Sequence, residues 1–377
     1  TLPGWHMRGM IRDMMLYHIR RFSDPRQKLQ QARALLEFLV KSVPADNNPY
    51  GQFLKSELEL LSRQTDNYLF HDHLEENNHP VYFHEFVSRA AAAGLRYLGD
   101  SDLRTMATRD LHPDAQKLLA TSLSQIETEQ YMDFLRNRMF RMSLLVHDDQ
   151  RHNLQIDNQK IREFHLAALL RPKAGGLPLN SSDAEEYSSP FGGSANVGMP
   201  LVKAALAVLA DAWPRRLPFG ELLAQASARL GLEVPTDAAG LARLTDLVGG
   251  PLLMLHTGLP FGALELALGQ VGAVTHAGEK PRAPASARRQ APGGIVTNVR
   301  HRLVQLDDFG RQLLPLLDGS RERSQVLDAL HEKVRKQELV IRENGVLVTN
   351  ADRVRQILDQ QLAATMQFLA QNSLLVA

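Results

Sequence analysis

The 377-residue sequence contains no cysteine, which excludes disulfide frameworks, thiolate metal sites and cysteine nucleophiles. It also lacks a surplus of charge of either sign, since 43 Lys and Arg stand against 42 Asp and Glu. A net charge of +1 gives no overall electrostatic case for binding nucleic acid or an anionic membrane. No uninterrupted apolar run reaches the ~18 residues of a membrane-spanning helix. We therefore expect a cytoplasmic protein without a membrane span or a nucleic-acid partner.

The familiar cofactor and catalytic loops are missing as well. The sequence holds neither the phosphate-binding pattern G-x-x-x-x-G-K-[ST] nor the G-x-S-x-G of α/β-hydrolases. No G-x-G-x-x-G follows a predicted strand, so we assign no cofactor-binding residue. The sequence starts at Thr1 and shows no signal-peptide pattern. We expect it to be a piece of a longer protein or a processed product.

Apolar residues at helical spacing dominate what is present. Asp24 followed by Pro25 predicts a helix start, because Asp caps free backbone amides and Pro fits the first turn. Residues 80–98 predict a helix, a left-handed Gly94 that ends it, and a short strand. Residues 200–270 return to a helical pattern. The apolar content of 44% fits a soluble globular protein of two or three domains.

Two stretches rich in Pro, Gly, Ser and Ala read as connections between domains. Residues 171–199 carry two Gly-Gly pairs and several prolines, which favours a linker or long loop. Residues 277–294 carry four basic side chains and one acid. This second stretch is interpreted as a solvated linker, with an anion-binding or docking strip as the alternative.

The last 80 residues follow the order of a winged helix. A helix over 306–317, a second helix capped by Ser320, an Asn344-Gly345 hairpin turn and a final helix capped by Asn350 are predicted. A DNA reader would need a basic recognition face. From 296 to 377 there are eleven Lys and Arg against ten Asp and Glu. The charge therefore favours a packing or protein-interaction role.

The densest polar cluster spans residues 71–85, with four His and four acids. His71 and His73 would share one side of an extended segment. With Glu75 or His84 as the third ligand, they could form a facial metal triad. The spacing is not diagnostic, so no metal ligand and no catalytic residue is assigned. A hydrogen-bonding or general-base role in a substrate pocket is the second alternative, and a solvated polar loop is the third.

The opening residues 1–8 form the other polar and aromatic feature. A Pro-Gly turn precedes Trp5, one of only two tryptophans in the sequence. Trp5 would either anchor this turn in the core or line a cleft.

Several stretches together resemble one family. LPGWHMRGMIRDMMLYH (2–18) is similar to the segment after the fifth core strand in a group of bacterial class I SAM-dependent methyltransferases. Residues 66–103, continuing to about Val146, resemble the methyltransferase regulatory domain of that family. Residues 281–301 and 313–321 resemble its C-terminal, winged-helix-like region. The resemblance covers nearly the whole chain, although its motifs are not catalytic signatures.

The resemblance implies an α+β, mostly helical fold: the C-terminal remnant of a Rossmann-like methyltransferase core followed by regulatory and winged-helix-like domains. The implied parts are the end of the core and the start of the regulatory region (1–105), the rest of that region (106–170), a helical winged-helix-like domain (171–276), the linker (277–294) and a C-terminal winged-helix-like domain (295–377). The cofactor S-adenosyl-L-methionine would be bound mainly by a missing N-terminal part.

The resemblance further implies a function: the substrate-recognition and regulatory portion of a SAM-dependent methyltransferase, acting on protein side chains such as lysine. Some relatives are protein-lysine methyltransferases, and aromatic and carboxylate groups suit a lysine through cation–π and charge contacts. The expected substrate-binding residues are Trp5, His73, Glu75, Tyr82, His84 and Glu85. A non-enzymatic protein-interaction scaffold and a metalloprotein are the alternatives. The sequence leaves open a homodimer and the identity of the methyl acceptor.

Overall fold

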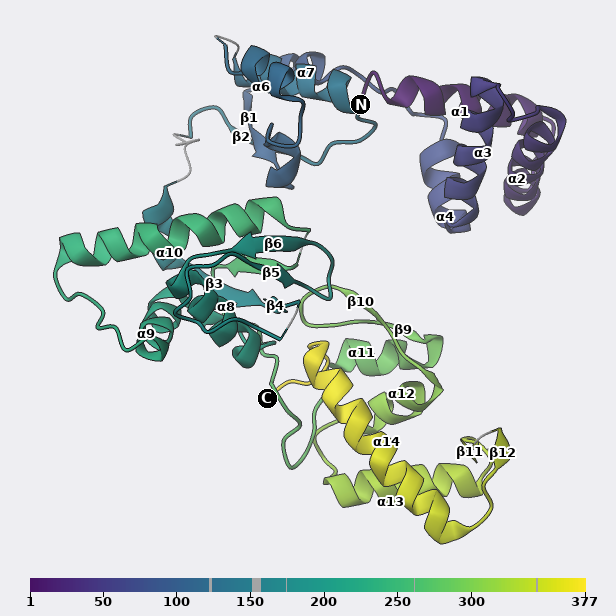
Figure 1. Cartoon of the computed structure of the whole chain (residues 1–377). Helices are drawn as coiled ribbons and strands as arrows, with labels where there is room; N and C mark the ends of the chain where they lie inside the picture. The colour runs from purple at the N-terminus through teal and green to yellow at the C-terminus, as the bar shows by residue number, and fades with distance from the viewer. Residues whose placement is uncertain (122–123, 151–156, 174, 261, 344) are drawn as a thin grey trace. The chain divides into compact units, whose positions relative to one another are not determined.

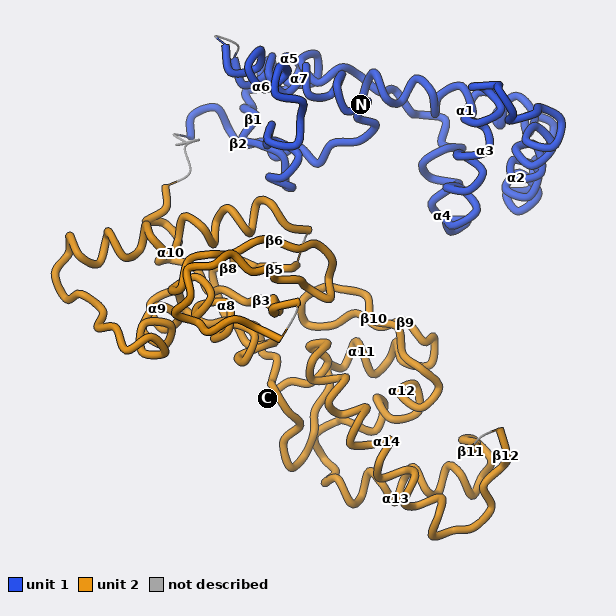
Figure 2. The backbone as a smooth tube through the Cα atoms, viewed as in Figure 1, with its two compact units in different colours: residues 1–154 blue, residues 155–377 orange. Residues whose placement is uncertain are grey.

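The computed structural model describes residues 1–121, 124–150, 157–173, 175–260, 262–343 and 345–377. Ala174, inside the predicted loop 171–199, and Asn344, of the predicted hairpin turn, lie outside the described residues. The chain divides into two compact units, Thr1–Leu154 and Gln155–Ala377, which Figure 2 shows in two colours.

Unit 1 begins with helices and ends with a two-stranded sheet (Figure 1). Its elements are α1 (Trp5–Ile19), α2 (Pro25–Ser42), α3 (Pro49–Ser62), α4 (Asp66–Tyr68), the π-helical turn η1 (Leu69–His73), α5 (Phe83–Ala92), β1 (Leu95–Asp100), the 3₁₀ turn η2 (Leu103–Met106), α6 (Pro113–Leu119), α7 (Gln125–Arg136) and β2 (Ser143–His147).

Local signals set the boundaries of the first helices. The Asp24 carboxylate accepts a hydrogen bond from the Gln27 amide at 2.8 Å, which confirms the predicted cap of α2. The Asn48 side chain caps α3 in the same way. Helices α1, α2 and α3 then bury a common apolar core with η1. Its fully buried members are Ile11, Met15, Ala32, Leu36, Leu54, Leu61 and Leu69.

The predicted helix–glycine–strand unit is present. Helix α5 ends at Ala92, Gly94 adopts φ +72°, and β1 follows at once. At this φ a side chain would clash with the backbone, so glycine is the residue that turns the chain cheaply. Strand β1 pairs antiparallel with β2, from Leu95 opposite His147 to Asp100 opposite Ser143.

A buried ion network joins α7 to the segment that leads into β2. Arg141 donates to Glu129 at 2.7 Å and to Asp133 at 2.9 Å, and Arg138 reaches Asp133 at 3.2 Å. The Tyr97 hydroxyl donates to Glu129 at 2.7 Å. Burial raises the pKa of Asp133. Because each charge is enclosed, the network holds α7 against the sheet only while its partners stay paired.

Unit 2 contains two apolar cores that follow one another along the chain. The elements of the first are η3 (Asn158–Glu163), β3 (His165–Ala168), β4 (Arg171–Pro172), β5 (Glu185–Ser188), β6 (Ser194–Val197), α8 (Pro200–Ala212), β7 (Leu217–Pro218), α9 (Phe219–Arg229), α10 (Ala238–Gly258) and β8 (Leu264–Ala267). Helices α8, α9 and α10 confirm the predicted helical stretch over 200–270.

The elements of the second core are α11 (Ala285–Gln290), η4 (Ala291–Gly293), β9 (Ile295–Thr297), β10 (Leu303–Gln305), α12 (Asp308–Leu313), η5 (Leu314–Leu316), α13 (Arg323–Arg335), β11 (Arg342–Glu343), β12 (Val346–Leu347) and α14 (Ala351–Gln371). Helix α14 is capped as predicted, because the Asn350 side chain accepts from the Arg353 amide at 2.9 Å. Glu322, rather than the predicted Ser320, is the N-cap residue of α13.

Two stretches predicted as connections carry regular structure instead. Within 171–199, β5 pairs antiparallel with both β4 and β6, and Tyr187 on β5 is buried. Within 277–294, α11 buries Ala287 in the second core, between buried Ala283 and Ala291. Alanine supplies apolar contact at helical spacing, so this stretch packs rather than staying solvated.

Helix α10 is 21 residues long and, by length and composition, apolar enough to cross a membrane. It packs against η3, α8 and β8, and Val248 and Leu252 point into the first core. In its apolar window 28% of the residues are buried inside the structure.

Candidate functional site

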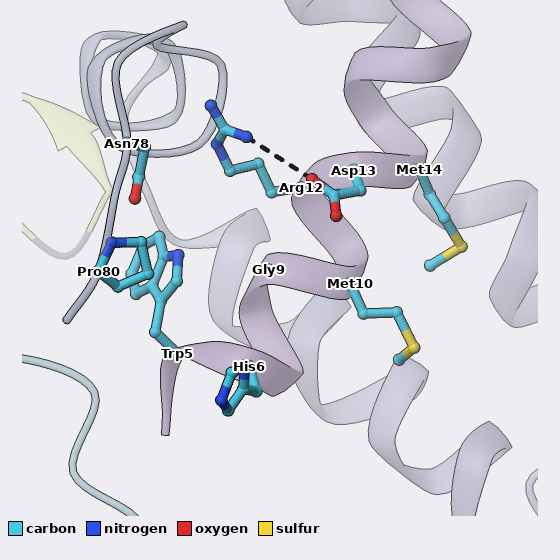
Figure 3. A pocket seen from close by; sticks show the side chains of 9 residues that line it. All are labelled: Trp5, His6, Gly9, Met10, Arg12, Asp13, Met14, Asn78 and Pro80. Atoms are coloured by element: carbon cyan, nitrogen blue, oxygen red, sulfur yellow. Dashed lines mark ion pairs between the residues drawn. The ribbon is translucent and has the colours of Figure 1, made fainter. Parts of the chain in front are cut away.

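A pocket of about 530 Å³ opens where α1 begins and the segment 78–80 passes beside it (Figure 3). Trp5, Met10 and Met14 supply apolar surface from successive turns of α1. The complete lining is Trp5, His6, Gly9, Met10, Arg12, Asp13, Met14, Asn78 and Pro80. The walls thus combine one indole, two thioethers and both signs of charge.

Behind the pocket, an imidazole lies between two aromatic rings. His73 is fully buried, and its ring centroid lies 6.0 Å from those of Trp5 and Tyr68. Neither ring nitrogen of His73 has a hydrogen-bond partner among the described residues. Trp5 thus contacts the buried imidazole and also lines the pocket.

The surroundings of His73 keep its imidazole neutral. Burial, and then the positive charge of Arg8, lower the pKa of His73 from 6.5 to about 4. Arg8 is itself buried and lies 3.5 Å from the buried Glu57 carboxylate. Burial and a hydrogen bond to Asp72 raise the pKa of the Tyr68 hydroxyl. At neutral pH the His73 imidazole is therefore uncharged, and the Arg8–Glu57 ion pair lies beside it.

Arg12 fastens the acidic loop after η1 to α1. Its guanidinium donates to the carbonyl oxygen of Glu75 and, at 3.4 Å, to that of Glu76. Because main-chain oxygens occupy Arg12, the side chains of Glu75 and Glu76 stay exposed. The Asp13 carboxylate, 78% exposed, lies 3.6 Å from Arg12 (Figure 3).

Tyr82, His84 and Glu85 lie together at the start of α5. The Tyr82 amide donates to the Glu85 carboxylate at 3.2 Å, which caps the helix. The rings of Tyr82 and His84 stack with centroids 5.8 Å apart. The Gln130 side-chain oxygen accepts from the His84 amide at 3.1 Å and lies 3.0 Å from His84 Nδ1. These contacts orient the three side chains around a helix start.

The expected substrate-binding residues therefore fall into two groups. Trp5 and His73 are in contact, and the backbone of Glu75 is tied to the same helix by Arg12. Tyr82, His84 and Glu85 form the second group. The expectation of an extended His71–His73 segment was wrong, because η1 is helical and leaves His71 exposed while His73 is buried.

No group of three or more His, Asp or Glu that could hold a metal ion occurs among the described residues. The sequence analysis missed Met10, Asp13 and Met14 as pocket residues. A signal was available, since Met7, Met10 and Met14 recur at helical spacing.

Two known domain families match the chain. The family described as "Predicted methyltransferase regulatory domain" matches residues 65–147. The family described as "PKMT, C-terminal winged helix domain" matches residues 279–374. The second match confirms the predicted C-terminal winged helix, and the elements of both units confirm the mostly helical α+β class.

Relatives from Rickettsia prowazekii (strain Madrid E) extend the comparison. RP789 is 31% identical over 391 residues, a match that covers 100% of this chain and 68% of RP789. RP028 is 42% identical over 98 residues, covering 26% of this chain and 39% of RP028.

The solved structure of PKMT2 from Rickettsia typhi is similar over the whole chain. Its TM-score is 0.83 at 27% identity, covering 100% of this chain and 73% of PKMT2. The structure of PKMT2 in complex with AdoHcy matches with the same TM-score at 28% identity.

A Rossmann-like core of the predicted kind is built on a mostly parallel sheet. Dinucleotide-like ligands bind such cores beyond the carboxyl ends of parallel strands. Every strand pair within the described part of this chain is antiparallel. By its match to RP789, its two domain families and its likeness to PKMT2, the chain belongs to the PKMT-like family that combines a methyltransferase regulatory domain with a C-terminal winged helix.

Proposed function

We propose that this chain is the acceptor-side portion of a SAM-dependent protein-lysine methyltransferase. The observation that carries the proposal is the likeness to PKMT2 over 100% of the chain at a TM-score of 0.83, together with an AdoHcy complex of that relative. The chain spans 73% of PKMT2 and 68% of RP789. In the proposal, this chain is part of a longer polypeptide. Its cofactor is bound by the segment that corresponds to the part of PKMT2 outside the match.

An exposed apolar stretch that leads into β2 supports a missing neighbour. Phe140 is 74% exposed, and Met142 and Leu144 are 53% and 46% exposed. The sheet has only the strands β1 and β2 in the described residues, and β2 carries neither Lys nor Pro, which commonly protect an open edge. In the proposal, the helix–glycine–strand unit of α5 and β1 closes the sheet of a Rossmann-like core.

The pocket at the start of α1 suits a lysine side chain. The Trp5 ring offers a cation–π contact to an ammonium, and the exposed Asp13 carboxylate in the lining offers charge. Glu75, outside the lining but joined to Arg12 through its carbonyl oxygen, adds a second exposed carboxylate. Methyl transfer to an amine requires the nitrogen to be deprotonated and held in line with the donor. The proposed task of these side chains is to gather and orient the acceptor.

The test uses the full-length polypeptide, S-adenosyl-L-methionine and a mixture of unfolded bacterial proteins. Mass spectrometry of the products locates each added methyl group. We expect methyl-lysine, and we expect Trp5→Leu to lower kcat/KM by about tenfold through loss of a cation–π contact. Trp213→Phe, in unit 2, is the matched control. Methylation confined to other residue types, or none, would overturn the proposal and favour a protein-interaction scaffold.

A further inference from the structure

Helix α1 has a second apolar row that its own core covers only in part, since Met14 of this row packs against that core. Ile11, Met15 and Ile19 point into the core. Met7, Met10, Met14 and Tyr17 recur at the spacing of a single helix face, and Met7, Met10 and Tyr17 are 45%, 41% and 69% exposed. An apolar row at this spacing that remains in water costs solvation free energy unless something covers it.

The exposed row runs directly into the pocket. Met10 and Met14 belong to both the row and the pocket lining, and in Figure 3 their side chains project from the opposite side of α1 from Trp5 and Pro80. Methionine has three rotatable bonds and a polarisable sulfur, and such surfaces adapt to partners of different shape. A rigid pocket for one small molecule would not need this flexibility.

The exposed charges near Met10 and Met14 include three carboxylates, one of which, Asp13, is paired with Arg12. Arg12 is occupied by the carbonyl oxygens of Glu75 and Glu76 and lies 3.6 Å from Asp13. The carboxylates of Asp13, Glu75 and Glu76 are exposed. This arrangement complements a positively charged side chain with an apolar neighbour.

We propose that the face Met7–Met10–Met14, with the adjoining pocket, docks the substrate polypeptide, and that it selects a lysine flanked by large apolar residues. The inference rests on the proposed function and adds the sequence context of the acceptor. The lysine enters beside Trp5 and Asp13, while the apolar neighbours lie on the methionines. Tyr17 is stacked under Arg20, whose guanidinium carbon lies 3.6 Å from the ring centroid, and it marks the far end of the surface.

Calorimetric titration of synthetic peptides into this 377-residue chain tests the docking without any methyl transfer. The probe is a nine-residue peptide of Gly and Ser with a central Leu-Lys-Phe. The comparison peptides replace Leu and Phe by Ser, or Lys by norleucine. We expect each replacement to weaken binding by about tenfold, because one apolar face or one charge is lost.

Substitutions in the exposed row of the protein should weaken peptide binding in the same way as the changes to the peptide. Met7→Ser combined with Met10→Ser should weaken binding of the Leu-Lys-Phe peptide about tenfold and leave the serine-flanked peptide unchanged. Asp13→Asn should weaken the binding of both lysine-containing peptides and leave the affinity for the norleucine peptide unchanged. The matched controls are Met254→Ser and Asp114→Asn, which change exposed side chains on α10 and α6.

The outcomes separate this inference from the proposed function. Equal binding of the Leu-Lys-Phe and serine-flanked peptides, or an unchanged affinity of the double methionine variant, overturns the docking surface. Concentration-dependent dimerisation of the chain that Met7→Ser with Met10→Ser abolishes would also overturn it, by assigning the face to a second copy. Apolar-dependent binding of a peptide that the full-length polypeptide never methylates supports the docking surface and overturns the methyltransferase proposal.

Discussion

Acid should destabilise unit 1 through His73, and replacing this residue should remove that part of the effect. The folded pKa of His73 is about 4, against 6.5 for the unfolded chain. Between these pH values the unfolded state binds more protons, so the stability contributed by His73 is complete above pH 6.5 and is lost as the pH falls toward 4. At pH 5 the protonation of His73 in the unfolded state lowers the free energy of unfolding by about 2 kcal/mol. At pH values well below 4 the loss reaches its limit of about 3.4 kcal/mol.

The measurement is urea unfolding at pH 7 and pH 5, followed by Trp5 fluorescence in a Trp213→Phe background. The variant His73→Leu fills similar space without a titrating group. It also removes two buried nitrogens that lack partners in the described structure, so at pH 7 it should be no less stable than the parent. Between pH 7 and pH 5 the parent should lose about 2 kcal/mol more than the variant.

Parallel pH profiles for the parent and His73→Leu would refute this reasoning. They would mean that the imidazole finds a proton-accepting partner or water on protonation, and that the enclosure by Trp5 and Tyr68 is not maintained in solution.

Two further predictions concern packing and charge. Gly4→Ala should destabilise unit 1 by about 2 kcal/mol, because a Cβ would overlap the Arg138 carbonyl oxygen at 2.5 Å. Gly9→Ala, whose Cβ would meet nothing closer than 3.8 Å, should stabilise α1 by about 1 kcal/mol, and urea midpoints distinguish the two. Arg141→Met should cost about 3–5 kcal/mol, since it removes the cation paired with buried Glu129 and leaves buried Asp133 with Arg138 alone, whereas Arg335→Met in an exposed pair should cost under about 1 kcal/mol. Equal losses for the two arginine variants would contradict the burial argument.

The sequence predicted best those features that a few neighbouring residues determine. The Asp24 cap, the left-handed Gly94 and the Asn350 cap depend on local hydrogen bonds and backbone freedom, and all three are present. The winged-helix order of the last 80 residues follows from such signals in succession.

Composition was misleading where distant partners decide the structure. Glycine and serine over 171–199 suggested a loop, yet β5 is a strand because β4 and β6 pair with it on both sides. The alanines of 277–294 suggested a linker, yet Ala283, Ala287 and Ala291 are buried against residues later in the chain. The four-residue spacing of these alanines indicated a buried helix face, although their composition suggested a linker.

The candidate site was visible only in part for the same reason. Tyr82 and Glu85 lie on a locally capped helix and could be expected together. The burial of His73 depends on Trp5, 68 residues earlier in the chain, and local spacing does not report such a contact. Helical spacing of Met7, Met10 and Met14 did mark a face, but only the structure distinguishes this exposed row from the buried one.

The most direct test of the central claim is calorimetric titration of S-adenosyl-L-homocysteine into this 377-residue chain and, separately, into the full-length polypeptide. The account predicts binding to the full-length polypeptide alone, with this chain supplying the acceptor side. Stoichiometric binding to the 377-residue chain by itself would contradict the account, because it would locate a cofactor site among residues that we assign to the acceptor.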